Sequence, residues 1–313
     1  MFGPGNWGRW GAGDERGALN LQTPEAVTAA AGCVREGRAL SLSMPIRGAT
    51  SNRAPTTVPH LPGRPLPQHF MSVDGGDYAA GARAIGPGLR MADDAILVSP
   101  HGTTTHMDAL CHMWAGEELY NGHPAGRVRS YGATRCGIDK AGPVVGRGVL
   151  FDVAALRGVP HLAASDRIDD ADLAACLATD MGGTELRPGD VAVVRTGWPL
   201  VWEADGPEAY WSGQPGLSAA GGRWLAERDV CMVACDNAAV GGLNADQLAD
   251  ETLDDDLHLI FLWRHGIYLA ELLWLEELAE ALRTAKRTDF LFVAAPLAIE
   301  GGTGSPINPV AVL

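Results

Sequence analysis

Residues 190–196 of the chain read DVAVVRT, an apolar run bounded by polar residues. Runs of the same kind lie at 148–153, 230–236 and 290–295. Near-continuous apolar runs of this length are typical of strands that are buried on both faces, as in the parallel part of an α/β sheet. The four runs therefore predict central, buried strands.

Amphipathic segments at 169–177, 218–227 and 273–283 alternate with these runs and predict helices. Because strands and helices alternate without a break in composition, the pattern favours one α/β domain over residues 1–313. Three further elements are predicted nearer the N-terminus: a helix over 23–35 with Thr23 as its N-cap, a strand over 38–45 and a short strand over 95–98.

Composition argues against two classes of partner. The formal net charge is −14, and Lys140 and Lys286 are the only lysines, whereas binding to nucleic acid requires clustered basic residues. No apolar run approaches the roughly 18–20 residues that cross a bilayer. The first residues lack a basic region followed by an apolar stretch, so no secretory signal is visible. We predict a cytoplasmic protein that binds neither nucleic acid nor membrane.

The six cysteines are too widely spaced to resemble a disulfide framework. Cys231 and Cys235 lie inside an apolar run and are predicted to be buried thiols of the core.

Residues 47–88 are dense in Pro, Gly, Arg and Thr, with little periodicity. We interpret them as a long ordered excursion that serves a site or an oligomer contact. Five aromatic residues in this segment, near the N-terminus or near the histidine cluster are candidates for contacting a substrate or for simple packing: Trp7, Trp10, His69, Phe70 and Trp114.

Residues 99–112 read SPHGTTTHMDALCH and concentrate candidate metal ligands. In an extended chain His106 and Asp108 point to the same face, and Asp108 and His112 share a face if a helix begins at Asp108. A strand-to-helix corner would gather all three. Imidazole with carboxylate is the ligand set expected for zinc or manganese, and residues 91–126 contain no Lys or Arg.

A metal site needs further ligands from elsewhere. His258 follows three aspartates, and Glu271 is an acid embedded in apolar sequence, which is costly unless it is paired or bound to a cation. The alternative for Glu271 is a carboxylate at a helix N-terminus, satisfied by backbone amides. His265 reads as an exposed residue at a helix end, and His123 as a turn residue.

The pattern THxDAxxH at 105–112, followed far downstream by His258 and GIYLAE at 266–271, resembles the metal-dependent cyclase/hydrolase family. That family contains bacterial kynurenine formamidase and isatin hydrolase. The resemblance covers nearly the whole chain and includes five further motifs: WGxxDExGxxN at 10–20, YNG at 120–122, RGVLFD at 147–152, RTGW at 195–198 and DN at 236–237.

The resemblance implies a single domain of the swivelling β/β/α type, with mixed β-sheet layers and flanking helices, assembled as a homodimer or homotetramer. It implies His112 as the proton-transfer residue. It implies five metal ligands: His101, His106, Asp108, His258 and Glu271. The family's usual motif places its first two histidines four residues apart. His101 and His106 are five apart, so His101 needs a bulge in the segment to reach the metal.

The implied reaction is hydrolysis of an amide, cyclic amide or lactone-type bond of a small molecule by metal-activated water, with one or two zinc or manganese ions and with His112 as general acid and base. A metal-dependent lyase or cyclase, which forms or opens a ring by dehydration, would use the same residues. A non-catalytic metal-binding protein is a third class. Cysteine hydrolysis by Cys111 beside His112 is a fourth, disfavoured because adjacent helical residues seldom face each other.

Overall fold

The computed structural model describes residues 5–47, 59–82, 85–178, 184–244 and 252–313. The strands of its central sheet are β1 (Ala39–Ser41), β4 (His106–Asp108), β7 (Val144–Asp152), β9 (Val191–Arg195), β11 (Met232–Cys235), β12 (Tyr268–Glu271), β13 (Asp289–Ala294), β14 (Gly304–Pro306) and β15 (Val310–Val312). Their order across the sheet is β1-β15-β13-β7-β9-β11-β12-β4-β14.

The middle of this sheet is parallel. Strands β7, β9, β11 and β12 run in the same direction, and every residue of β9 and β11 is buried. The apolar runs at 148–153, 190–196 and 230–236 are therefore central strands, as predicted. The run at 290–295 forms β13, which is antiparallel to both neighbours and alternates between buried and half-buried residues. One face of β13 is therefore less buried than the apolar sequence at 290–295 predicted.

The sheet curls back on itself. Pro306 ends β14 and Val310 begins β15, so their Cα atoms are at most about 14 Å apart along an extended chain. In a flat sheet of this order the same two strands would lie about 34 Å apart, because roughly 4.8 Å separates neighbouring strands. The two edges of the sheet must therefore approach each other.

The helices are α1 (Pro24–Ala31), α2 (Gly75–Ala79), α3 (Val153–Leu156), α4 (Asp170–Ala178), α5 (Pro199–Trp211), α6 (Ala219–Ala226) and α8 (Glu276–Ala285). Shorter 3₁₀ turns are η1 (Gly17–Leu21), η2 (Tyr120–Gly122), η3 (Ala125–Arg127) and η4 (Ile138–Lys140), and η5 (Leu259–His265) is a π-helix. The helices predicted at 23–35, 169–177, 218–227 and 273–283 are present as α1, α4, α6 and α8, and the mixed α/β class is confirmed.

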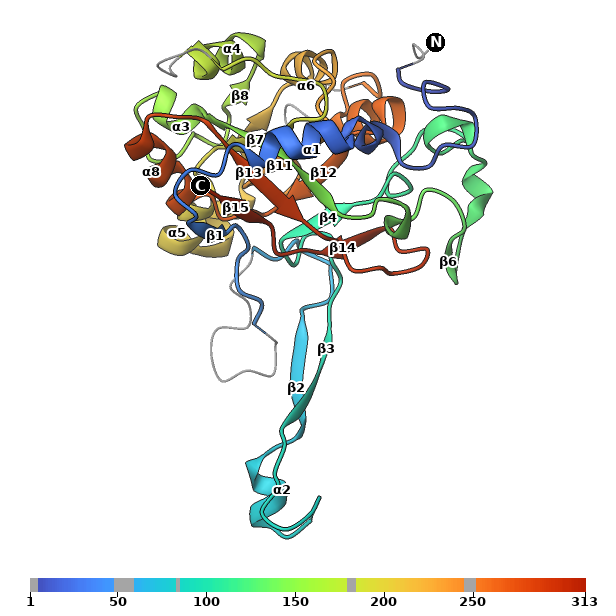
Figure 1. Ribbon diagram of the computed structural model, residues 1–313, viewed down its shortest axis with the longest axis vertical. Helices are drawn as coiled ribbons and strands as arrows, with labels where there is room; N and C mark the ends of the chain where they lie inside the picture. The colour runs from blue at the N-terminus through green and yellow to red at the C-terminus, as the bar shows by residue number, and fades with distance from the viewer. Residues whose placement is uncertain (1–4, 48–58, 83–84, 179–183, 245–251) are drawn as a thin grey trace.

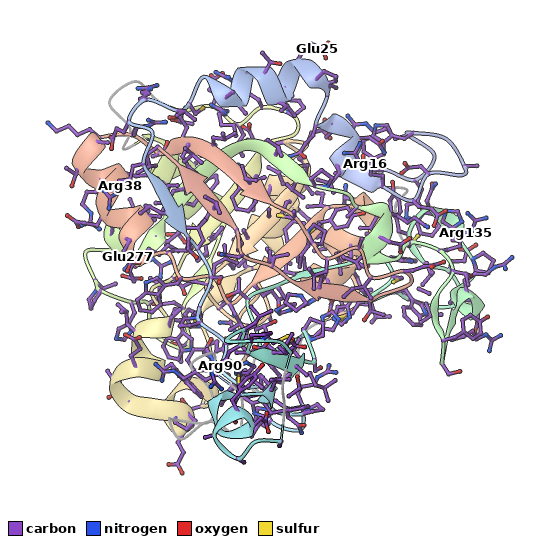
Figure 2. All side chains as sticks on the ribbon, turned by 60° about the horizontal axis from the view of Figure 1, so that its bottom comes forward. Arg16, Glu25, Arg38, Arg90, Arg135 and Glu277 are labelled. Carbon is purple, nitrogen blue, oxygen red and sulfur yellow. The ribbon has the colours of Figure 1, made fainter. Side chains whose placement is uncertain are left out.

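The sequence at the N-terminus of helix α1 explains where this helix begins. The Thr23 hydroxyl accepts a hydrogen bond from the backbone of Ala26 at 3.2 Å, which caps the helix as predicted. The helix ends at Ala31, before the predicted Arg35, and Gly32 is its C-cap residue. Helix α1 packs across β7 and β13, while Glu25 on its outer side points away from the body (Figures 1 and 2).

A narrow arm projects from the body (Figure 1). It consists of β2 (Gln68–Val73), α2 and β3 (Asp93–Leu97), and the two strands pair antiparallel as a separate ribbon. The predicted strand at 95–98 is thus part of the arm and does not join the central sheet. Of the predicted excursion over 47–88, residues 48–58 and 83–84 lie outside the described residues.

Short two-stranded pairs complete the fold: β5 (Val128–Arg129) with β6 (Gly132–Ala133), and β8 (Arg167–Ile168) with β10 (Gly216–Leu217). Cys231 and Cys235 are buried in the core, as predicted. Within the described ranges, the helices are too short or too polar to span a membrane.

Candidate metal centre

Two antiparallel strands near one edge of the sheet carry three of the predicted ligands. Strand β4 pairs with β12, and His106 lies directly opposite Glu271. Because side chains alternate along a strand, His106 and Asp108 share one face, as their spacing predicted. Strand β14 pairs with the other side of β4 and makes it an inner strand. These three candidate ligands therefore lie on paired strands and not in a loop.

His106 faces two acids. Its Nε2 atom lies 3.4 Å from Asp108 Oδ1 and 3.4 Å from Glu271 Oε2. Its other nitrogen, Nδ1, donates to the backbone carbonyl of Thr104 at 2.8 Å. Metal-bound histidines usually donate their second ring nitrogen in this way, which fixes the ring and leaves the first nitrogen for the metal.

His258 reaches the same group from the N-terminus of η5. Its Nε2 atom lies 3.3 Å from Glu271 Oε1 and 3.8 Å from Asp108 Oδ2. The fold thus brings His258 to side chains on β4 and β12, as the resemblance implied.

The two carboxylates are buried and short of partners. Asp108 is 1 % exposed and Glu271 is 3 % exposed. Asp108 Oδ2 and Glu271 Oε1 accept no hydrogen bond from the described residues. Glu271 lies in β12, so the alternative of a carboxylate capped by helix amides is wrong. Because a buried carboxylate oxygen without a hydrogen bond is costly, these atoms fit a bound cation.

The pKa values of these histidines and acids also indicate that positive charge is favoured beside the buried carboxylates. Burial lowers the pKa of His106, but Asp108 and Glu271 outweigh burial and raise that pKa to about 10. Burial likewise opposes the charge on His258, and Glu271 raises the pKa of His258 to about 9. Burial raises the pKa of Asp108, yet His112, His101 and His106 hold it well below its usual range. Without a metal, the His106 and His258 imidazoles therefore carry protons near pH 7. A divalent cation would supply the same positive charge to the two carboxylates, with the imidazoles neutral as ligands.

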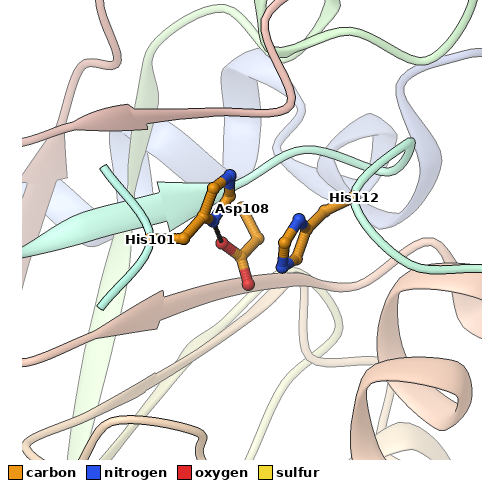
Figure 3. A group of neighbouring side chains, drawn as sticks. All are labelled: His101, Asp108 and His112. Carbon is orange, nitrogen blue, oxygen red and sulfur yellow. Dashed lines mark hydrogen bonds and ion pairs between the residues drawn. The ribbon is translucent and has the colours of Figure 1, made fainter. Parts of the chain in front are cut away.

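A second group of side chains shares Asp108 (Figure 3). His101 Nδ1 lies 2.8 Å from Asp108 Oδ1, and His101 Nε2 lies 3.1 Å from the Thr303 hydroxyl. Ligating atoms of His101, Asp108 and His112 all lie within 4.8 Å of one another, as do those of His106, Asp108 and Glu271. Asp108 is therefore common to both candidate groups.

The turn at 101–105 absorbs the extra residue between His101 and His106. Gly102 adopts a left-handed conformation with φ of 69°, and the strand begins only at His106. His101 consequently reaches Asp108 from a turn, and no bulged strand is needed. Gly304 makes room for the ring, because a Cβ atom there would lie 2.5 Å from His101 Cε1.

His112 lies in a turn, not in a helix. Its backbone N–H donates to the Ala109 carbonyl at 2.9 Å. No helix begins at Asp108, so the predicted strand-to-helix corner is wrong. The turn still brings the ring close, stacked on His101 with 3.8 Å between centroids. Burial, together with His101 and His258, lowers the pKa of His112 to about 4. The ring is therefore neutral near pH 7.

The remaining candidates lie elsewhere. His123 follows a turn and bonds the Asp14 carbonyl at 3.1 Å, as predicted for a turn residue. His265 ends η5 and is half-buried, so the expected exposure is wrong. Burial raises the pKa of the Cys111 thiol to about 12, which leaves no thiolate for the cysteine mechanism.

The aromatic residues that were candidates for contacting a substrate lie in different parts of the molecule. Trp7 packs edge-on against Trp263, while His69 and Phe70 lie on the arm. Trp114, two residues beyond His112, is 37 % exposed and is the candidate nearest the centre in sequence. A cavity of about 200 Å³ reaches His258. Its other lining residues are Met113, Leu217, Ala219, Ala239, Gly241, Gly242, Leu243, Asp255, Asp256 and Leu257.

Thr303 is the site residue that the sequence analysis missed. It orients His101 and precedes β14 in the run GGTGSP at 301–306. The glycines in that run were the available signal, since glycine beside a strand marks a close approach of backbone to another group.

Known proteins share this arrangement of elements. The family model described as "Putative cyclase" matches residues 40–241. A crystal structure of a novel cyclase is 36% identical, with 99% of this chain and 97% of that chain covered and a TM-score of 0.88. No curated protein sequence matches.

Two more distant structures share the fold. An isatin hydrolase bound to the product analogue thioisatinate is 17% identical, with 93% of this chain and 99% of that chain covered and a TM-score of 0.61. A potential metal-dependent hydrolase with cyclase activity is 18% identical, with coverage of 88% and 98% and a TM-score of 0.51.

A curled mixed sheet with a buried group of histidines and acids at one edge defines an α/β protein with a candidate metal centre. The chain belongs to the cyclase family.

Proposed function

We propose that this protein is a metal-dependent hydrolase that cleaves an amide, cyclic amide or lactone-type bond of a small molecule. One observation carries the proposal: two buried carboxylate oxygens, on Asp108 and Glu271, lack hydrogen-bond partners among the described residues and face imidazole nitrogens. The metal-dependent hydrolase and the isatin hydrolase of the same fold support this class of reaction.

The proposed ligands of one ion are His106, Asp108, His258 and Glu271. The proposed ligands of a second ion include His101, with Asp108 as the shared carboxylate. Zinc or manganese suits imidazole and carboxylate together. When bound, such an ion lowers the pKa of water toward neutrality and polarises a carbonyl.

His112 is the proposed proton carrier. Because its pKa is lowered to about 4, its ring is neutral near pH 7 and can accept a proton from an attacking water. The same nitrogen then returns the proton to the leaving nitrogen or oxygen. The stack on His101 holds the ring in place.

The surroundings favour a neutral substrate. Residues 91–126 contain no Lys or Arg, and the cavity at His258 is lined mainly by apolar residues and by Asp255 and Asp256. Such a pocket would repel a strongly anionic compound such as a nucleotide. A cyclic amide or lactone carries no charge before it is opened.

We also propose a homodimer or homotetramer that is held by the arm. Several large apolar side chains on the arm are exposed, including Phe70 at 50 %, Ile96 at 56 % and Leu97 at 64 %. A two-stranded ribbon alone is marginally stable in water, so a covering surface would stabilise it. We place the protein in the cytoplasm, which the wide spacing of its cysteines supports.

The test is metal removal and replacement. The purified protein, treated with a chelator and dialysed, should lose hydrolysis of a panel containing N-formylkynurenine, isatin and simple lactones. Added zinc or manganese should restore it, and magnesium at the same concentration serves as control. Bound metal with no turnover of any compound would favour the non-catalytic alternative. Ring closure with release of water, without hydrolysis, would favour the cyclase or lyase.

A further inference from the structure

The residue after Glu271 has an unusual backbone. Leu272 has φ of 57°, in the left-handed region, and its side chain is fully buried. Residues other than Gly, Asn and Asp rarely adopt this conformation, because Cβ crowds the backbone. Such strain persists only where the surrounding structure imposes it, and it concentrates at functional sites.

Three contacts impose this conformation. The Leu272 N–H donates to the Asn237 carbonyl at 3.0 Å, and the Leu272 carbonyl accepts from the Thr105 hydroxyl at 2.6 Å. The Leu272 side chain packs with Met44 in a small buried cluster. The turn that ends β12 is therefore held by contacts from other segments.

Thr105 connects these segments. It is 2 % exposed and immediately precedes His106, so its hydroxyl ties β4 to the residue that follows Glu271. The same oxygen accepts the backbone N–H of Met44 at 3.1 Å. One hydroxyl thus joins residue 44, β4 and the end of β12 at a buried point beside the His106–Glu271 pair.

We propose that Thr105 is a positioning residue that sets the separation of His106 and Glu271 by holding Leu272 left-handed. This inference rests on the proposed metal centre. Without the hydroxyl, the Leu272 carbonyl and the Met44 N–H would be buried without partners. The strained turn would then relax, and the Glu271 carboxylate would move away from His106.

Cobalt(II) binding to the metal-free protein tests this inference, since the visible absorption of cobalt reports ligand geometry. Thr105→Val keeps the volume but loses the hydroxyl, whereas Thr105→Ser keeps the hydroxyl. We expect T105V to raise the cobalt dissociation constant at least about 10-fold and to change the spectrum, as substitutions of outer-shell residues do. T105S should stay within about 3-fold and keep the wild-type spectrum.

Thr196→Val is the matched control, because the Thr196 hydroxyl is also buried and donates to Asp236 at 2.6 Å, and neither residue is a proposed ligand. T196V should lower the melting temperature and leave cobalt binding unchanged. If T105V does not fold, Thr105→Ala, which leaves room for a bridging water, should still weaken cobalt binding.

The inference would be overturned if T105V, or folded T105A, bound cobalt as tightly as the wild type does. It would also be overturned if T196V weakened cobalt binding as much as T105V does. A wild-type protein that binds no cobalt, zinc or manganese would overturn the proposed function itself.

Discussion

The imidazole rings of His101 and His112 lie parallel, with 3.8 Å between centroids and 6° between planes. His101 is bonded through both ring nitrogens, to Asp108 and to Thr303. Its ring therefore cannot turn without breaking two contacts. The stack therefore orients the His112 ring against His101, whose own ring is held by contacts at both nitrogens.

Replacement of His112 by asparagine should separate chemistry from metal binding. We expect kcat/KM for the hydrolysed substrate to fall at least 100-fold, about the lower range for loss of a general acid or base. Metal content, measured by plasma mass spectrometry, should stay at the wild-type level. His123→Asn is the matched control and should keep full activity. Retained activity in H112N would remove His112 from the mechanism.

Asp108→Asn should abolish metal binding. The amide keeps the shape of the side chain but loses the charge that both groups of ligating side chains share. Metal content after purification should fall to background, and activity should fall with it. Asp94→Asn, on the exposed arm, is the control and should bind metal normally. Full metal content in D108N would exclude Asp108 as a ligand.

Asp236 should make stability depend on pH. Burial raises its pKa from 3.8 to about 6, even though the Thr196 and Gly197 amides hydrogen-bond to it. The folded state therefore holds a proton that the unfolded state has released. The contribution of Asp236 to stability is fully present below pH 3.8 and is lost as the pH rises through about 6.

Denaturant unfolding of the wild type and Asp236→Asn at several pH values measures this loss. The wild type should lose roughly 2 kcal/mol relative to D236N between pH 4 and pH 7, since each pKa unit corresponds to about 1.4 kcal/mol and part of the loss precedes pH 4. Parallel stability curves for the two proteins would show that Asp236 titrates normally.

Charges on the arm should disrupt assembly. Phe70 and Leu97 lie on one face of the ribbon, because Leu97 pairs with Gln68 and positions 68 and 70 share a face. Phe70→Asp with Leu97→Asp should shift the mass measured by light scattering to that of a monomer and leave circular dichroism unchanged. Tyr131→Asp, at a side chain that is 76 % exposed on the body, is the control. An unchanged oligomer would exclude this face as the interface.

The sequence predicted the parts of the centre that depend on local periodicity. The alternation of side chains in β4 placed His106 and Asp108 on one face, and apolar runs located β9 and β11. Glu271 stood out because an acid in apolar sequence needs a partner. These features follow from a few consecutive residues, and they agree with the structure.

Features that depend on contacts between distant segments were not predictable in this way. The stack of His101 on His112 depends on a turn geometry, and Thr303 lies far along the chain from His101. The left-handed Leu272 is imposed by Thr105 and Asn237, so nothing in its own neighbourhood marks it. The pairing of β3 with β2, away from the central sheet, depends on where the chain reverses in the arm.

The curl of the sheet has a consequence for biosynthesis. Residues 304–306 form the outer neighbour of β4, and residues 310–312 pair with β1 and β13 near the opposite edge. On the ribosome, β4 therefore emerges long before the strand that covers its open edge. His106 and Asp108 therefore lie on a strand whose outer edge stays unpaired until residues 304–312 have been translated. This one short segment then pairs with both early strands, β1 and β4.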